Sequence, residues 1–332
     1  MKKFQSIELR VLLEENPIEG YIEKIFFCDN DLVIAYSHKG KRYLIVKPGL
    51  VFYGETEIMC NKKKTRFSLV LEKYLEHKKI LNAKIINSER LLLIEFQDYN
   101  LYMEFYPPGI IVLTDKNNTI LETNITKNFG WRVIEKGKPY IYRQSPNPFD
   151  IESFYKLKES DKKDLVRALA IDLGFGKVYA NELLLRTNIE NKSPKLLTDK
   201  EIELLYNSFI ELYNDRKPAI VNNDVVPFNL LYYKDYEKIY FPTYTQAVKE
   251  FLKEKEETKI KHIEETIKKL EELYNYYKEI GDKLMQNQYY LEQLRQNIII
   301  AAKQYGWEKV KKYLESRGII VNEKEGYFEI DL

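Results

Sequence analysis

The sequence has little cysteine and little histidine. Its 332 residues contain two cysteines, Cys28 and Cys60, and three histidines. The cysteines form no CxxC pair and lie in strand-like surroundings, so we expect two buried apolar side chains rather than a disulfide or a metal site. The histidines, His38, His77 and His262, are scattered, and no HExxH or Walker sequence occurs. We therefore expect no metal, no cofactor and no catalytic residue.

The chain also lacks a long hydrophobic run and a large net charge. Its start, MKKFQSIELR, has no apolar core of the kind found in export signals, and no run approaches the length of a membrane span. We therefore expect a cytoplasmic protein with no membrane partner. Because the formal net charge is only +2, a nucleic-acid surface must arise from local clustering of basic residues. The length is enough for two or three domains.

The first part of the chain is mostly extended. After a helix predicted over residues 6–15, apolar runs such as DLVIAYS and LLLIEFQ alternate with turn clusters. A helix predicted over residues 67–75 crosses between two groups of these runs. Many short antiparallel strands with two inserted helices indicate an α+β fold, either a β-sandwich or an open barrel. We assign residues 1–150 to this domain.

The sequence LAIDLGFGKVYANELL has the hxGhGxxxAxxhh pattern of a helix-hairpin-helix. Gly174 and Gly176 allow a tight backbone turn, and the small Ala180 lets the two helices approach closely. The N–H groups that open the second helix suit a phosphate of a nucleic-acid backbone. An ordinary pair of helices, in which the glycines only make the turn, explains the pattern equally well. We assign residues 151–252 to this module. Its candidate turn residues are Gly174, Phe175, Gly176 and Lys177.

Residues 253–303 have apolar side chains every three to four positions, separated by lysine, glutamate and glutamine. This stripe predicts one long coiled-coil helix, which projects roughly 60–70 Å. A single helix cannot bury its own stripe, so we expect a partner helix. It is either a second copy of the chain or a returning half supplied by a longer one. Residues 304–332 predict a short helix, a stop at Gly318 and two strands. Because the sequence ends on the strand-like GYFEIDL, we expect a fragment.

Several short sequences follow one another in a recognisable order. They are QSIELRVLLEE, RFSLVLEKYLEHKKI, NSER, PPGIIVLTDKNNTIL, WRVIEKGKPY, LGFGKVYANELLLRTNI, FPTYTQAVKEF and KLMQNQYYLEQL. In this order they resemble the NFACT family of ribosome-associated quality-control factors, some of which carry the name fibronectin-binding protein. The resemblance implies an N-terminal domain similar to that of formamidopyrimidine-DNA glycosylases, a helix-hairpin-helix module, a coiled-coil arm and a C-terminal RNA-binding domain. The last of these has no counterpart in this sequence.

The resemblance also implies partners. Family members bind the large ribosomal subunit with an obstructed peptidyl-tRNA, recruit tRNA and support template-free tailing of the stalled peptide. The family's tRNA-handling motif has an Asp near the N-terminus and an Asp-Arg pair before a strand. The matching positions here are Glu8, Glu89 and Arg90. A carboxylate beside an arginine can orient the guanidinium toward a phosphate or a base edge. Because both carboxylates are one methylene longer here, tailing is more in question than RNA binding. The alternative is that Glu89 and Arg90, which flank a strand, are simply exposed turn residues.

Two clusters of basic residues favour an RNA surface. The first lies before and within the helix predicted over residues 67–75, and contains Lys62, Lys63, Lys64, Arg66, Lys73, Lys78 and Lys79. The second interleaves cations with aromatic residues, which suits phosphate contact combined with base stacking. Its candidate RNA-binding residues are Lys127, Trp131, Arg132, Lys138 and Arg143. The alternative is that the lysines are only solvated surface charges and the aromatic residues belong to the core.

The sequence therefore predicts a ribosome-associated, RNA-binding scaffold whose partners are tRNA and the large ribosomal subunit. We expect no enzyme activity, because the chain lacks the Pro-Glu start and the four zinc cysteines of the DNA glycosylases. Any tailing would be carried out with the ribosome. Two alternatives stay open. One is a protein-binding adhesin of the fibronectin-binding type, against which the lack of an export signal counts. The other is a DNA-binding, repair-like module.

Overall fold

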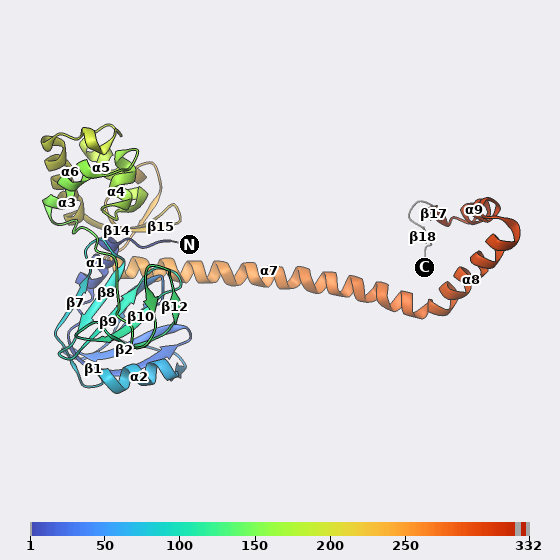
Figure 1. Ribbon diagram of the computed structural model, residues 1–332, viewed down its shortest axis with the longest axis horizontal. Coiled ribbons are helices and arrows are strands. Elements are labelled where there is room, and N and C mark those ends of the chain that lie inside the picture. Colours follow the sequence, from blue (N-terminus) through green and yellow to red (C-terminus); the bar gives the residue numbers. More distant parts are fainter. Residues whose placement is uncertain (1, 323–326, 330–332) are drawn as a thin grey trace. The chain divides into compact units, whose positions relative to one another are not determined.

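The computed structural model describes residues 2–322 and 327–329. The chain forms two compact units that divide between Lys253 and Glu254. Figure 1 labels their helices and strands.

Two antiparallel sheets make up the start of the first unit. One has the strand order β4-β3-β2-β1-β5, with β6 also paired to β1, and the other has the order β11-β10-β9-β8-β7. The strands of the first sheet are β1 (Gly20–Cys28), β2 (Asp31–Ser37), β3 (Lys41–Lys47), β4 (Val51–Glu55), β5 (Lys62–Lys63) and β6 (Lys79–Ile80). Those of the second are β7 (Asn82–Ile85), β8 (Leu91–Glu95), β9 (Tyr99–Glu104), β10 (Ile111–Asp115) and β11 (Ile120–Thr123). The predicted α+β class with antiparallel strands is confirmed.

Strands β8 and β10 of the second sheet are buried on both faces, which explains why they read as continuous apolar runs. In β8, Leu92 and Ile94 belong to the main core, whereas Leu91 and Leu93 belong to a smaller cluster. Alternate side chains of a strand point to opposite faces, so this smaller cluster lies on the outer face. It is completed by the chain that follows β11, which includes the hairpin β12 (Lys127–Asn128) and β13 (Val133–Ile134).

Two helices pack against strands of both sheets. Helix α1 (Ser6–Glu15) contacts β4 and β7, and α2 (Arg66–Leu75) contacts β1 and β11. Both helices contribute fully buried leucines to the core. The periodicity of the sequence predicts both helices, α1 with the bounds that the structure has and α2 to within one residue at its start.

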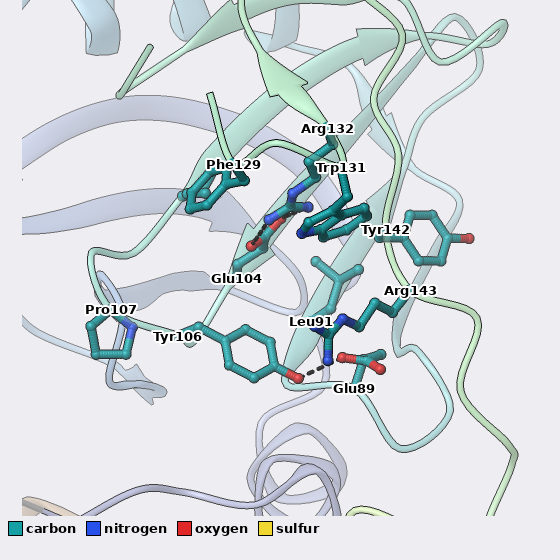
Figure 2. A pocket seen from close by; sticks show the side chains of 11 residues that line it. Glu89, Leu91, Glu104, Tyr106, Pro107, Phe129, Trp131, Arg132, Tyr142 and Arg143 are labelled. Carbon is teal, nitrogen blue, oxygen red and sulfur yellow. Dashed lines mark hydrogen bonds and ion pairs between the residues drawn. The ribbon is translucent and has the colours of Figure 1, made fainter. Parts of the chain in front are cut away.

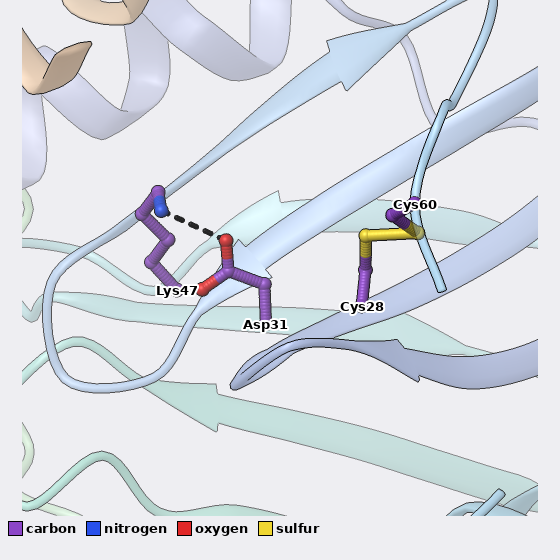
Figure 3. The surroundings of a disulfide bond; sticks show 4 residues. All are labelled: Cys28, Asp31, Lys47 and Cys60. Atoms are coloured by element: carbon purple, nitrogen blue, oxygen red, sulfur yellow. Dashed lines mark ion pairs between the residues drawn. A yellow bond between two sulfur atoms is a disulfide. The ribbon is translucent and has the colours of Figure 1, made fainter. Parts of the chain in front are cut away.

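The two cysteines form a disulfide (Figure 3), so the expectation of unpaired side chains is wrong. The short strand β5 pairs with the end of β1, with Cys28 opposite Lys62. This pairing brings the Cα atoms of Cys28 and Cys60 to 5.8 Å, within the usual range of ~4.4–6.8 Å for a disulfide. A two-residue strand leaves no periodicity in the sequence, so this proximity was not predictable from it.

The rest of the first unit is mainly helical, and its apolar core is continuous with that of the sheets. Its elements are α3 (Ile151–Tyr155), η1 (Lys156–Glu159), α4 (Leu165–Ile171), α5 (Gly176–Thr187), η2 (Pro194–Leu196), α6 (Asp199–Asn214), β14 (Arg216–Val221), β15 (Asp224–Phe228), η3 (Leu231–Tyr233) and β16 (Lys238–Tyr240). The three strands form a small sheet in the order β15-β14-β16. Helix α7 (Tyr244–Gln286) begins here, where the Glu15 carboxylate accepts hydrogen bonds from the N–H groups of Tyr244 and Thr245.

The predicted single helix over 253–303 is present as two helices. Helix α7 ends at Gln286, and α8 (Gln288–Tyr305) begins after Asn287. The Asn287 side chain donates a hydrogen bond to the carbonyl of Lys283 at 2.9 Å, and such local bonds compete with a regular helix. The apolar stripe of α7 is exposed. Its side chains Ile263, Ile267, Leu270, Tyr274 and Tyr277 are 46–66% accessible.

The second unit has a small core of its own. Helix α9 (Trp307–Ser316) packs on α8 through Val310 and Leu314, which contact Ile298. Two strands follow, β17 (Ile320–Asn322) and β18 (Tyr327–Glu329). The short helix and the two strands expected after the long helical stretch are therefore present. In the part of the chain that the structure describes, no helix is long and apolar enough to cross a membrane.

Candidate nucleic-acid interface

A pocket lies on the outer face of the second sheet, where the chain that follows β11 crosses the strands (Figure 2). Its lining comes from the loop before β8, the end of β9 and the loop after it, and the segment 127–143: Glu89, Leu91, Glu104, Tyr106, Pro107, Ile110, Phe129, Trp131, Arg132, Tyr142 and Arg143. Its volume is about 230 Å³, below the ~300–1,000 Å³ of pockets that enclose a drug-sized ligand. The pocket therefore suits one ring-sized part of a larger molecule.

Glu89 and Arg90 meet at Tyr106 on one side of this pocket. The Tyr106 hydroxyl donates to Glu89 Oε2 at 2.5 Å and accepts from the Arg90 N–H at 3.1 Å. The Arg90 guanidinium lies 4.1 Å from the centre of the Tyr106 ring. Burial, together with the bond to Glu89, raises the pKa of Tyr106 to about 12. The phenol therefore stays protonated and fixes the carboxylate, while the partly buried arginine is held on a ring face.

Arg132 is buried on the opposite side of the pocket. Its Nη1 and Nη2 donate to the two carboxylate oxygens of Glu104, both at 2.7 Å, and Nη1 also donates to the carbonyl of Ile141 at 2.9 Å. The Tyr140 hydroxyl donates to the same Glu104 at 2.8 Å. Burial and the Glu104 charge raise the pKa of Tyr140 well above its ordinary value. Arg132, predicted as an RNA contact, is thus bound to a carboxylate.

The other residues of the second basic cluster are accessible. Trp131 is 49% exposed, and the guanidinium groups of Arg132 and Arg143 lie 4.7 and 5.8 Å from its ring. Lys127 lies over Phe129 at 5.1 Å. Lys127 and Lys138 are exposed but do not line the pocket. The structure therefore gathers Glu89, Trp131, Arg132 and Arg143 at one site, with Arg90 beside it.

Glu8 lies in the core and is not part of the pocket. Its carboxylate accepts hydrogen bonds at 2.6 Å from Lys2 Nζ, the Gln5 N–H and the Tyr179 hydroxyl. Lys2 also pairs with Asp224 at 2.6 Å. Burial raises the pKa of Glu8, an effect that the Lys2 charge opposes. Because Glu8 has no exposed surface, its geometry anchors α1 to α5 and offers nothing to a ligand.

The turn between α4 and α5, where the sequence predicts a helix-hairpin-helix, packs against the start of α1 and the loop that carries Glu89. Gly174 and Gly176 have φ values of +67° and +71°. A Cβ atom on Gly174 would lie 2.7 Å from the Ser88 carbonyl oxygen, and one on Gly176 would lie 2.9 Å from the Gln5 side chain. Phe175 is buried, and Lys177 is exposed. Turn geometry and packing therefore account for both glycines, and the phosphate site stays a prediction.

In the first basic cluster, two of the lysines are paired with carboxylates, which offset their positive charge. Lys64 binds the Ile25 carbonyl at 2.9 Å and the Glu72 carboxylate, and Lys78 pairs with Asp98 at 3.2 Å. The lysines of β5 are exposed.

Sequence reasoning missed Glu104, Tyr106 and Phe129 as site residues. The signal available in the sequence was Glu104, an acidic residue at the end of the buried strand β9. Its partner Arg132 is 28 positions away in the sequence. Among the described residues, no group of three or more His, Cys, Asp or Glu side chains is placed to hold a metal ion.

A family model covers most of the chain, and one curated relative matches nearly all of it. The sequence model described as the NFACT N-terminal and middle domains matches residues 13–315. The archaeal Rqc2 homolog aRqcH of Methanocaldococcus jannaschii is 28% identical over 372 residues, covering 95% of this chain and 55% of that protein. The chain therefore spans about half the length of this relative.

Two solved structures share the fold. One is the N-terminal part of the fibronectin/fibrinogen-binding protein from Streptococcus suis, with a TM-score of 0.60, 17% identity, and coverage of 76% of this chain and 99% of that one. The other is the fibrinogen binding protein from Staphylococcus aureus, with a TM-score of 0.57, 15% identity, and coverage of 74% and 98%. At these identities the likeness concerns the fold alone.

Proposed function

This chain belongs to the NFACT family, and we propose that it acts in ribosome quality control by binding tRNA and the large ribosomal subunit of stalled peptidyl-tRNA complexes. Its similarity to an archaeal Rqc2 homolog supports this proposal. In this role the protein is cytoplasmic and associated with ribosomes. It is a scaffold and not an enzyme, so any tailing of the stalled peptide depends on the ribosome.

The pocket beside Arg90 is the observation that carries the RNA-binding proposal. Aromatic rings line it, and Arg143 lies at its edge. Rings of this kind stack on bases irrespective of sequence, and arginines at the edge suit phosphates. Single-stranded loops are where proteins reach unstacked RNA bases. A tRNA loop fits this combination better than duplex DNA, whose bases are stacked and paired.

The binding of this chain to labelled tRNA and to duplex DNA of equal length, over a series of salt concentrations, tests the proposal. We expect tRNA to bind more tightly, and Arg90→Ala and Arg143→Gln each to weaken binding and to lower the dependence on salt. Arg42→Ala, which removes an exposed arginine from the first sheet, is the matched control. Equal binding of DNA and tRNA would instead support the repair-like alternative, and binding of fibronectin without tRNA the adhesin.

The exposed stripe of α7 is the surface for a partner helix, supplied by a second copy of the chain or by further sequence of the same protein. Sedimentation distinguishes the two. A dimer that Leu270→Glu dissociates indicates a second copy, whereas a monomer indicates that the partner helix comes from elsewhere.

A further inference from the structure

Arg132 differs from the exposed cations near the pocket because its charge is buried and already paired. The side chains of Arg132 and Glu104 are only 8% and 6% exposed. Both ends of the guanidinium are bound to the carboxylate at 2.7 Å. Paired, bidentate contacts of this kind are the strong class of hydrogen bond. A phosphate would have to displace Glu104 in order to reach Arg132, and the displaced carboxylate would then be left buried beside it.

Glu104 accepts hydrogen bonds from two residues of the segment 127–143 that lines the pocket. Arg132 lies in the turn of the β12–β13 hairpin, and Tyr140 follows eight residues later in the sequence. Both donate to Glu104, which ends β9. The backbone of the hairpin itself has only two paired positions, Lys127 with Ile134 and Asn128 with Val133. So short a ladder is a weak constraint on its own. Residues 137–140 are attached to the start of β11 by backbone hydrogen bonds, and the contact of Arg132 with Glu104 attaches the hairpin turn to β9.

The same arginine lies between the aromatic residues of the pocket wall. Its guanidinium is 4.7 Å from the Trp131 ring and 5.1 Å from the Phe129 ring, and Figure 2 shows it reaching Glu104 between them. Arg132 therefore contacts both rings while it is fixed to the strand. We therefore expect a change in the pairing of Arg132 with Glu104 to move the two rings that line the pocket.

We propose that Arg132 is a positioning residue for RNA: through Glu104 it fixes Phe129 and Trp131 at the pocket wall, and it does not contact phosphate itself. The inference rests on the proposed function and assigns the phosphate contacts to exposed cations such as Arg143. Glu104, although negatively charged, then supports the binding of a polyanion.

The sign of the Glu104→Gln effect tests this proposal. Removing the carboxylate adds one net positive charge and frees Arg132. If Arg132 were a phosphate contact, tRNA would bind more tightly. We expect the opposite, a loss of about tenfold or more, because the rings are no longer held. Arg132→Gln should give a similar loss, and the double variant no more than either single one, since both changes break the same contact.

The salt dependence separates positioning from contact. For Arg143→Gln, the slope of log affinity against log salt should fall by about 0.7–0.9, as expected when one phosphate contact is lost. For Arg132→Gln and Glu104→Gln the slope should not change. If Arg132→Gln lowers the slope as Arg143→Gln does, or if neither variant alters affinity, the proposal is wrong.

Fluorescence measures the position of the segment without RNA. The sequence has two tryptophans, so Trp307→Phe leaves Trp131 as the reporter. We expect acrylamide to quench Trp131 more strongly in Arg132→Gln and Glu104→Gln, with the circular dichroism of the fold retained. Unchanged quenching would contradict the proposal. If the wild-type chain binds no tRNA, the proposed function fails, while this measurement still decides whether the pair positions the rings.

Tyr140→Phe covers the case in which the stronger variants do not fold. It removes one hydroxyl from Glu104 and keeps the ring that packs at 4.5 Å on Tyr102. We expect a loss of affinity of about two- to fivefold, the effect of one hydrogen bond, with an unchanged salt slope. Affinity equal to that of the wild type would overturn the role of Glu104 as the attachment point.

Discussion

The carboxylate of Glu8 is a buried junction between three parts of the chain. It binds Lys2 near the N-terminus, the N–H of Gln5 before α1, and Tyr179 on α5. The resemblance to the family implies a role in handling tRNA for this position. Because Glu8 is fully buried, any such role would be indirect: Glu8 binds the N–H of Gln5, whose side chain packs against Gly176 in the turn between α4 and α5.

Removal of the Glu8 carboxylate should destabilise the first unit. Glu8→Ala leaves the buried Lys2 without one of its two carboxylates, and we expect the free energy of unfolding to fall by about 3–5 kcal/mol. Glu8→Gln keeps an acceptor for Tyr179 and should cost less. Urea denaturation measures both. The control is Glu19→Ala, whose side chain is 63% exposed and should change stability by less than about 0.5 kcal/mol. Equal losses for Glu8→Ala and Glu19→Ala would show that the buried pair is unimportant.

At the scale of elements, the turn between α4 and α5 packs directly against the backbone of the loop before β8. Gly174 approaches Ser88, the residue before Glu89, so closely that a side chain does not fit. We expect Gly174→Ala to lower stability by more than the ~1–2 kcal/mol that a left-handed backbone costs an alanine. The comparison is Gly130→Ala, which has a φ of +82° and open space around it. Thermal unfolding of both variants measures the difference. Backbone strain is common to the two, so any additional loss in Gly174→Ala is due to the clash with Ser88.

The disulfide connects β1 to the chain before β5. It closes a loop with a sequence separation of 32 residues, for which the chain-entropy relation gives about 3–4 kcal/mol. The double variant Cys28→Ser/Cys60→Ser should therefore unfold at a lower urea concentration than the oxidised protein. Under a reducing agent the wild type and the variant should have the same midpoint. A wild-type midpoint that does not respond to reduction would contradict this account.

Elements with a local pattern were predictable, and those set by distant partners were not. Helix α1 and strand β2 have the bounds that their periodicity and turn residues predict. The strands β5, β12 and β13 have two residues each, too few for a pattern, and exist only because a partner strand lies beside them. The same holds at the candidate site. Glu89 and Arg90 were identified by a motif, whereas the burial of Glu8 depends on Tyr179, which is 171 positions away.

At the scale of the whole molecule, the first unit buries several tyrosines, in its main core and in the smaller cluster on the outer face of the second sheet. Tyr179 and Tyr244 have almost no exposed surface, and Tyr102 and Tyr140 are 3% exposed. Their hydroxyl groups act as donors to Glu8, Val225, Asn118 and Glu104. Each of these bonds requires a protonated phenol. We therefore expect the unit to lose stability at alkaline pH, where these phenols ionise when the chain unfolds.

Burial raises the pKa of Tyr102 to about 12, and raises those of Tyr140, Tyr179 and Tyr244 well above the ordinary value. In the unfolded chain these phenols ionise near pH ~10. Above that pH the unfolded state binds fewer protons than the folded state, so the free energy of unfolding falls as pH rises, by up to about 1.4 kcal/mol per group and pH unit. We expect urea denaturation to show this decline as the pH is raised from ~8 to ~11, and Tyr140→Phe to make the decline less steep. A free energy that stays constant over this range would mean that the buried phenols ionise in the folded state as readily as in water.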